Sequence, residues 1–193
     1  MAPSLSQKRA TPPWTPDGQI FRLCLDLNVW VSGYLADQED HRNTATQALV
    51  EVARDGRCAL GSTQVVVSWS MLTRLRGVFE TKFRMSQAEV DREIRLIQRY
   101  ASYGPSKNAP YVLLGGTGVM PLHDEEDAHV LDTAVAGDAH VLATANFDDF
   151  IWYRTEIVKP GRIAIHEGPR QPLVIAHPFE VVRWTREGRI TFD

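Results

Sequence analysis

The sequence lacks long apolar runs, has only two cysteines and shows no large excess of charge of either sign. No apolar stretch approaches the roughly 20 residues that a membrane-spanning helix needs, and the first residues lack the apolar core of a signal peptide. We therefore expect a soluble, cytoplasmic protein without membrane contact. Cys24 and Cys58 lie in separate apolar segments, which favours free thiols in a reducing compartment over a disulfide.

The chain also lacks the charge and the motifs that mark several protein classes. Its formal net charge is -3, so no global positive charge indicates a nucleic-acid binder, and only a local basic face would fit that role. No CxxC pair or His/Cys cluster indicates a zinc site. With 193 residues, 44% of them hydrophobic, the chain is long enough for one domain with a sizeable core. We expect a Pro-rich flexible lead-in over residues 1–19 and a single domain over residues 20–193.

Apolar spacing predicts that strands and helices alternate along the chain. Expected strands cover residues 20–27, 57–60, 64–67, 111–114, 139–143, 162–165 and 173–175, with a final short strand within 186–193. Expected helices cover residues 41–55, 69–83, 87–103, 123–137 and 178–184, and a helix or turn covers 28–35. Ser68 and Ser86 are the expected N-caps of two helices that form an αα hairpin. The alternation predicts an α/β sandwich with a mainly parallel sheet.

One carboxylate lies inside the apolar stretch FRLCLDLNVWVSG, residues 21–33. A buried strand tolerates an ionised Asp26 only if a metal ion, a helix N-terminus or several hydrogen bonds replace the lost hydration. Asp26 is therefore the first candidate site residue. The alternative interpretation is that Asp26 ends the strand and caps the next helix.

Further acidic side chains lie at other predicted element ends. The stretch HDEEDAHVLDTAVAG, residues 123–137, begins with four carboxylates, and the helix dipole alone accounts for the first three. The fourth, Asp127, shares a side with the apolar residues that follow it. Asn146 and Asp149 come directly after the strand over 139–143, where open α/β sheets bind ligands. Hard oxygen ligands of this kind suit Mg²⁺ or Mn²⁺, whereas three unrelated capping acids are the alternative.

Four segments together resemble the successive motifs of PIN-domain proteins. They are LDLNVWVSG (25–33), SWSMLTRLRGVF (68–79), DEEDAHVLDTAV (124–135) and VLATANFDDF (141–150). The resemblance covers roughly residues 20–185, and it is closest to the VapC-like toxins of bacteria. It implies a three-layer α/β/α fold with a central, mainly parallel sheet. It also implies a metal-dependent ribonuclease that cleaves RNA, often a homodimeric toxin held inactive by a small antitoxin protein.

The resemblance also implies roles for individual residues. Asp26, Asp127 and Asp149 would be the catalytic carboxylates, and with Asn146 they would hold Mg²⁺ or Mn²⁺. Supporting roles would fall to Asn28, which would hydrogen-bond beside Asp26, and to Thr144, which would either hydrogen-bond within the site or end its strand.

The second motif departs from the family pattern, because Arg74 stands where most members have a Glu. A positive charge near a divalent ion weakens cation binding. Glu80 lies six residues further along the same helix and faces another way, and Asp124 is a better substitute ligand, although capping explains it equally well. Arg74 would either hold a substrate phosphate through its planar guanidinium or lie on the helix surface.

Three functions therefore stay open. The first is a Mg²⁺- or Mn²⁺-dependent ribonuclease with an RNA substrate and an antitoxin partner. The second is a catalytically impaired PIN-like module that binds RNA or a protein partner, and the third is a metal-dependent phosphatase or DNA nuclease of similar architecture. Side chains that would contact a nucleic acid are the basic residues Arg74, Arg76, Lys82 and Arg84 and the aromatic residues Trp69, Trp152 and Tyr153.

Overall fold

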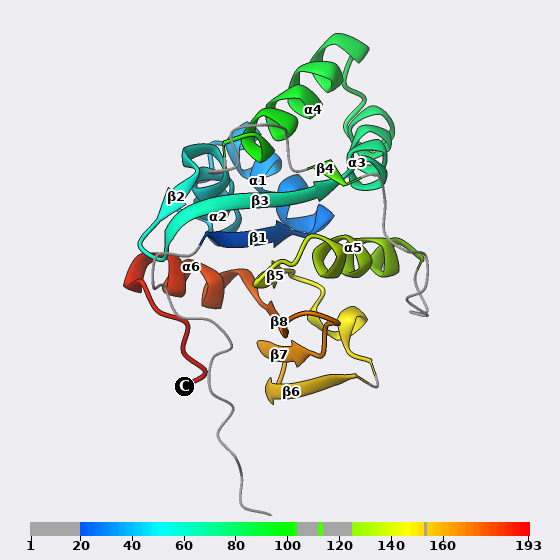
Figure 1. Cartoon of the computed structure of the whole chain (residues 1–193). Helices are drawn as coiled ribbons and strands as arrows, with labels where there is room; N and C mark the ends of the chain where they lie inside the picture. Colours follow the sequence, from blue (N-terminus) through cyan, green and yellow to red (C-terminus); the bar gives the residue numbers. More distant parts are fainter. Residues whose placement is uncertain (1–19, 104–111, 114–124, 153) are drawn as a thin grey trace, which may run out of the picture.

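The structure is a computed structural model, and it describes residues 20–103, 112, 113, 125–152 and 154–193. At residues 112, 113 and 125–127 it describes the backbone. A single sheet runs through the molecule, with the helices α3 and α4 at one end and strand β6 at the other (Figure 1). Within the described residues, no helix is both long enough and apolar enough to cross a membrane.

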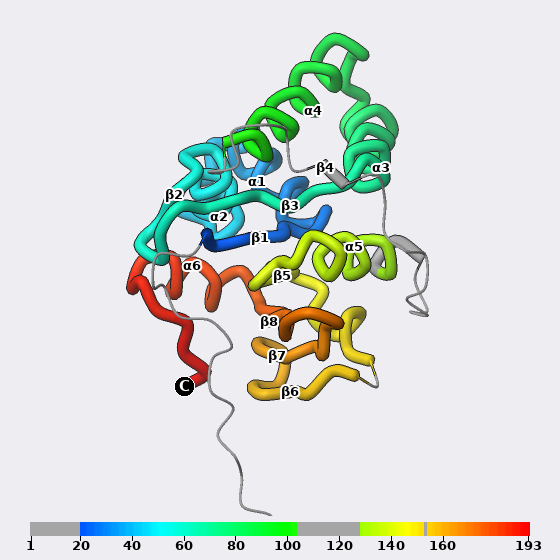
Figure 2. The backbone as a smooth tube through the Cα atoms, viewed as in Figure 1, coloured from blue at the N-terminus to red at the C-terminus, as the bar shows by residue number. Residues whose placement is uncertain are grey.

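The sheet has the strand order β2-β3-β1-β5-β8-β7-β6, and β4 pairs with β3. Its strands are β1 (Phe21–Leu25), β2 (Arg57–Cys58), β3 (Gly61–Ser68), β4 (Val112–Leu113), β5 (Val141–Ala143), β6 (Thr155–Lys159), β7 (Ile163–His166) and β8 (Leu173–Ala176). Strands β4, β3, β1, β5 and β8 are parallel to one another, whereas β2, β7 and β6 pair in antiparallel fashion. Segments far apart in the sequence, such as β1 and β5, therefore lie side by side (Figure 2).

The helices are α1 (Leu27–Gln38), α2 (Ala45–Asp55), α3 (Trp69–Thr81), α4 (Gln87–Ala101), α5 (Glu125–Ala136) and α6 (Pro178–Glu187), with a 3₁₀ turn, η1 (Phe147–Phe150). Among the described residues, five of the six helices, all except α5, begin after a residue whose side chain caps them. Ser68 and Ser86 cap α3 and α4 as predicted, and Ser86 forms a reciprocal capping box with Glu89. Helices α1, α2 and α6 pack in a row, and α5 packs against β3, β1 and β5. The result is the predicted three-layer α/β/α arrangement.

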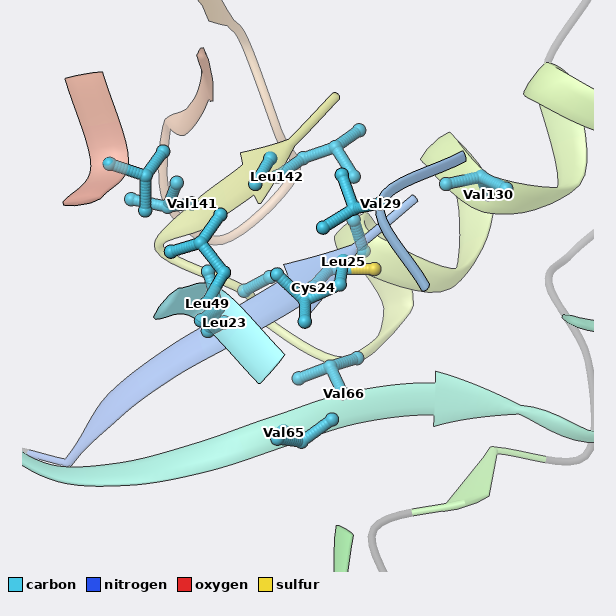
Figure 3. Close-up of a cluster of buried hydrophobic side chains, with 14 of the residues drawn as sticks. Leu23, Cys24, Leu25, Val29, Leu49, Val65, Val66, Val130, Val141 and Leu142 are labelled. Atoms are coloured by element: carbon cyan, nitrogen blue, oxygen red, sulfur yellow. The ribbon is translucent and has the colours of Figure 1, made fainter. Parts of the chain in front are cut away.

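The core lies where the central strands meet these helices. All three residues of β5 and four of the five residues of β1 are buried, as expected for parallel strands covered on both faces. Leu23, Leu49 and Leu142 come from β1, α2 and β5, and they belong to one cluster of buried side chains (Figure 3). Cys24 is buried and Cys58 is partly buried, and both are free thiols, as predicted.

Three predictions about the elements need correction. The helix predicted from residue 41 begins at Ala45, because Asn43 adopts a left-handed backbone conformation and Thr44 is the N-cap. The strand predicted within 186–193 does not form in these residues, all of which the structure describes. Instead α6 continues to Glu187, Gly188 ends it in a left-handed conformation, and Trp184 Nε1 donates to the Thr191 carbonyl at 2.9 Å. Strand β6 was not predicted at all.

The structure describes only part of the predicted strand at residues 111–114. Val112 and Leu113 form β4, while Tyr111 and Leu114 lie outside the described residues.

Candidate active site

Four parallel strands end next to one another at a single edge of the sheet. The strand registers align the last residues of β1, β5 and β8, and the residues that follow are Asp26, Thr144 and His177. Ser68 ends the neighbouring strand β3 on the other side of β1. Open parallel sheets bind their ligands at this edge. The fold therefore gathers several of the polar residues selected from the sequence.

The Asp26 side chain accepts three hydrogen bonds. Its Oδ1 accepts from the backbone N–H of Leu27 at 2.6 Å, and by this bond Asp26 caps α1. Its Oδ2 accepts from Asn28 Nδ2 at 2.6 Å and from Thr144 Oγ1 at 2.7 Å. Only 3% of Asp26 is exposed. The structure thus confirms the helix N-cap and adds a hydrogen-bond cluster around the same carboxylate.

Asn28 and Thr144 connect the start of α1 with the end of β5. Asn28 Oδ1 accepts from the backbone N–H of Ala145 at 3.2 Å, and Asn28 Nδ2 lies 3.4 Å from Thr144 Oγ1. Thr144 Oγ1 also accepts from the backbone N–H of Asn146 at 3.0 Å. Because both partners of Asp26 are themselves fixed by these bonds, the carboxylate is held in one orientation.

Burial raises the pKa of the Asp26 carboxyl from its usual 3.8 to about 6. Hydrogen bonds from Thr144, Leu27 and Asn28 lower this pKa, whereas the charge of Asp149 raises it. No cationic side chain among the described residues forms an ion pair with Asp26. Burial, and after it the charge of Asp26, also raises the pKa of the Cys24 thiol. Among the described residues, no paired cation therefore offsets the negative charge of the buried Asp26 carboxylate.

Asn146 and Asp149 lie just beyond the end of β5. Asp149 belongs to η1, and its backbone N–H donates to the carbonyl of Asn146 at 3.2 Å. Both residues are exposed, and Asp149 is near enough for its charge to act on the Asp26 carboxyl. The structure thus brings Asp26, Asn28, Thr144, Asn146 and Asp149 to one edge of the sheet.

Asp127 lies in the first turn of α5, and Asp124 lies outside the described residues. Helix α5 connects the parallel strands β4 and β5, and a crossover helix of this kind starts at the carboxyl edge of its sheet. Later in α5, Thr133 Oγ1 forms a hydrogen bond with Ser68 Oγ at 2.9 Å. This buried hydroxyl pair fixes α5 against the end of β3, and sequence analysis missed it because neither residue lies in an acidic cluster.

Arg74 lies in the middle of α3 and is half-buried. It follows Ser70 by four residues, so both occupy one face of the helix, and Ser70 Oγ is 2.8 Å from Ser68 Oγ. Ser70 and Arg74 therefore lie on one side of α3, which begins directly after Ser68. Glu80 is exposed and pairs with Arg76 at 3.7 Å, so it does not replace the missing carboxylate of the second motif.

The remaining candidates for nucleic-acid contact are scattered. Arg76 forms a 2.7 Å ion pair with Asp91 of α4, and this pairing occupies its charge within the helical hairpin. Trp69 is 46% exposed at the start of α3, Trp152 is partly buried, and Tyr153 lies outside the described residues. Lys82 and Arg84 lie in the connection between α3 and α4, and the end of the hairpin where α3 meets α4 is far from β1 (Figure 1).

The donor atoms at this edge are those that a hard divalent cation prefers. A carboxylate offers about four acceptor positions, and the three hydrogen bonds to Asp26 leave one of them on Oδ1. Asp149 supplies a second, exposed carboxylate close by. No group of three or more His, Cys, Asp or Glu side chains suited to a metal occurs among the described residues. The two carboxylates of Asp26 and Asp149 have the hard oxygen atoms that a Mg²⁺-type cation prefers.

In a comparison with protein families, residues 22–148 match the model of the PIN domain. This range includes well over half of the 193 residues. The chain belongs to the PIN domain family. PIN domains are generally nucleases, and PIN nucleases generally use divalent metals. The comparison with curated proteins gives no match.

The PIN match agrees with the location of the site. It begins in β1, four residues before Asp26, and it ends inside η1, one residue before Asp149. The segment after it forms β6, β7, β8 and α6, which complete the sheet of this PIN domain. All four motif segments begin within the matched range, so the family assignment made from the sequence is confirmed.

Proposed function

We propose that this PIN domain is a Mg²⁺- or Mn²⁺-dependent endoribonuclease of the VapC-like type. The observation that supports it most is the state of Asp26, which is buried, hydrogen-bonded through both oxygens and without a cationic partner among the described residues. The N-cap bond and the two side-chain hydrogen bonds offset only part of the cost of burying its charge, because the pKa of Asp26 stays raised. A divalent cation at the same position would offset the charge of Asp26 and of Asp149 together.

Asp26 and Asp149 would hold the cation in this proposal, with Asp127 as the third carboxylate and Asn146 as a further oxygen donor. When bound, the ion supplies charge stabilisation for the phosphoryl group and an activated water nucleophile. The residues around Asp26 orient its carboxylate, because the hydrogen bonds from Asn28 and Thr144 prevent it from rotating away from the ion. The substrate would be RNA, whose scissile phosphate would lie above the ends of β1 and β5.

The biological role proposed here is that of a toxin in a toxin–antitoxin pair. It is supported by the resemblance of the four motifs to VapC-like proteins, which implies an antitoxin protein as partner and a homodimer as assembly. A cytoplasmic location follows from the same role. Growth arrest on expression of the wild-type chain, relieved by Asp26→Asn, would be the direct observation of toxicity.

One observation favours a second function, a PIN module that binds RNA or a protein without cleaving RNA. Arg74 occupies the place of a carboxylate in the second motif, and it lies in α3, which begins directly after β3 at the same sheet edge as Asp26. A cation at that position weakens binding of a divalent ion. Metal affinity therefore distinguishes the two functions.

The test is calorimetric titration of Mn²⁺ and Mg²⁺ into wild type and single variants, with RNA cleavage followed on the same samples. Asp26→Asn, Asp127→Asn and Asp149→Asn are expected to lose saturable binding and to reduce cleavage about a hundredfold or more. Asp148→Asn is the matched control, because Asp148 is the exposed neighbour of Asp149 in the same turn. It should bind metal and cleave RNA as wild type does.

Absence of metal binding by wild type at millimolar concentration, together with cleavage no faster than in the Asp26→Asn sample, would refute the nuclease. That result would favour the binding module. Equal losses in Asp148→Asn and Asp149→Asn would instead show that the effect comes from net charge and not from a specific ligand.

A further inference from the structure

A second group of side chains lies on the same edge of the sheet as Asp26, two strands away. It consists of Arg162, His177 and Phe179, which come from the turn before β7 and from the start of α6. The backbone N–H of His177 donates to the carbonyl of Arg162 at 2.9 Å, so the two segments are fixed to each other. We call these three residues the Phe179 cluster.

The Phe179 ring is the most exposed large hydrophobic side chain among the described residues, at 62%. The His177 ring stacks against it, with centroids 5.2 Å apart and planes at 25°. The Arg162 guanidinium carbon lies 5.7 Å from the Phe179 centroid, and Arg162 Nη1 is 3.0 Å from His177 Nδ1. Because Arg162 and His177 contact each other, they lie on one side of the ring and leave its other side to solvent.

The fold does not require an apolar ring at this position. Helix α6 packs through Val181, Val182 and Trp184, which are all buried, whereas Phe179 points away from that face. Single exposed apolar side chains are common on protein surfaces, but this ring also lies beside the candidate site and contacts His177 and the Arg162 guanidinium. The ring therefore has the exposure and the location expected of a ligand-binding group.

The charge of the cluster is positive. Arg162 forms no ion pair with a carboxylate among the described residues. The nearest acidic side chain in sequence, Glu180, is 8% exposed and already pairs with Lys159 at 2.9 Å and with Arg183 at 3.0 Å. Glu180 is thus already paired with two cations, and the Arg162 guanidinium offers a positive charge to an anion beside the ring.

A short path of backbone contacts links the cluster to the candidate active site. Thr144, which donates to Asp26, has its backbone N–H bonded to the carbonyl of Ala176 at 3.0 Å, and His177 is the next residue. Adjacent strands lie about 4.8 Å apart, so two strand spacings separate Asp26 from the start of α6 by roughly 10 Å. A flanking nucleotide of a strand bound at Asp26 reaches that far.

We propose that Phe179 and Arg162 form a nucleotide subsite for single-stranded RNA, in which the base stacks on Phe179 and a phosphate binds Arg162. This inference rests on the proposed ribonuclease function and extends it. Every base has a flat face, so a ring of this kind favours unpaired RNA of any sequence over a duplex, whose bases are already stacked. The position beside the site and the positive charge favour RNA over an apolar protein segment as the occupant.

The test measures RNA binding separately from cleavage. A fluorescein-labelled oligoadenylate of about 12 nucleotides is titrated into the full chain in EDTA, and anisotropy gives the Kd. Phe179→Ala is expected to raise the Kd about fivefold to a hundredfold, while Phe179→Trp retains binding. Arg162→Gln is expected to reduce the slope of log affinity against log salt by about 0.7. A hairpin duplex of the same length should bind weakly to all variants.

Two matched controls make the result specific. Ile157→Ala removes another exposed large hydrophobic side chain, 50% exposed on β6, and Arg170→Gln removes an exposed arginine from the opposite edge of the sheet. Both should leave the Kd unchanged. Phe179 is exposed, so its variants should also unfold at the wild-type temperature.

Equal Kd values for wild type and Phe179→Ala would overturn the subsite, even if the protein cleaves RNA in Mn²⁺. If sedimentation then shows that Phe179→Ala alters self-association, the ring is a protein contact and the RNA subsite is again refuted. Loss of RNA binding in Phe179→Ala without any cleavage by wild type would support the subsite and refute only the nuclease.

Discussion

At the scale of single residues, Asp26 combines two roles with opposite electrostatic demands. As the N-cap of α1 it stabilises the helix, and a charged carboxylate caps better because it also interacts with the helix dipole. As a side chain that is 3% exposed, it is stabilised when it is neutral. Burial prevails, since the pKa is raised to about 6. The fold therefore carries an unfavourable charge at neutral pH that a bound cation would relieve.

This conflict predicts how Asp26 contributes to stability in metal-free buffer. A carboxyl group whose pKa is higher in the folded state contributes stability below its unfolded pKa of 3.8 and loses it as the pH rises through about 6. The loss amounts to about 3 kcal/mol for a difference of roughly two pKa units. Urea unfolding of wild type and Asp26→Asn between pH 4 and pH 7, in EDTA, measures it.

The comparison with Asp26→Asn is necessary because His140 changes the free energy of unfolding with the opposite sign in the same pH range. Burial lowers the pKa of His140 to about 4, so its contribution is present above pH 6.5 and is lost as the pH falls through about 4. The contribution of His140 to the free energy of unfolding cancels in the difference between wild type and Asp26→Asn. We expect this difference to fall with rising pH and to recover in Mn²⁺. A difference that stays constant across the range would contradict the raised pKa of Asp26.

At the scale of elements, the helices were predictable where a local signal starts or ends them. Ser86 with Glu89 forms the capping box of α4, and Gly56 ends α2 in the left-handed conformation, with a backbone φ of 64°. Such signals act within one helical turn, so the sequence contains them in full. The predictions were less successful for elements that no helix cap starts or ends. Strand β6 (Thr155–Lys159) is a half-exposed edge strand paired with β7, and it lacks an alternating pattern of buried and exposed residues, although Pro160 and Gly161 form a turn directly after it.

The glycine at the end of α2 gives a prediction about the packing of that element. Gly56 and Gly161 both have a φ of 64°, but a Cβ at Gly56 would lie 3.3 Å from the Tyr103 carbonyl oxygen, whereas nothing lies within 4 Å at Gly161. We expect Gly161→Ala to lower the free energy of unfolding by about 1 kcal/mol, the cost of the left-handed backbone. Gly56→Ala should cost more, because Tyr103 must also move.

Chemical denaturation of the two variants under identical conditions measures this difference. If both substitutions cost the same, the contact between α2 and the end of α4 contributes nothing, and only the backbone conformation of Gly56 matters. Gly161 is the appropriate control because its turn between β6 and β7 has the same φ and open surroundings.

At the scale of the whole molecule, the candidate site is assembled from segments more than 100 residues apart. Asp26 and Thr144 were both selected from the sequence, because each follows a buried apolar strand, and the hydrogen bond between them connects positions 118 residues apart. The parallel sheet makes such meetings predictable, since the ends of its strands share one edge. The Phe179 cluster was not predictable, because an isolated Phe beside a Pro carries no periodic signal and its exposure depends on how α6 packs.

The extent of the domain gives the last prediction. The PIN family match ends at residue 148, yet the strand beside β5 is β8, whose four residues, Leu173–Ala176, are all buried. Helix α6 adds Trp184, which is 0% exposed. A chain that ends at residue 150 would leave β5 as an open apolar edge and remove the side chains that cover it. We expect this chain to aggregate or to bind a hydrophobic dye, without a cooperative thermal transition.

A chain that starts at residue 20 is the matched control for that truncation. It keeps β1 whole, including Phe21 with 0% exposure, and it keeps every strand of the described sheet. We therefore expect a single cooperative transition within a few degrees of the wild-type temperature, as the prediction of one domain over residues 20–193 requires. Cooperative unfolding of the chain that ends at residue 150 would show instead that the matched segment folds alone. In that case β8 and α6 would be an addition to the PIN domain and not a part of its core.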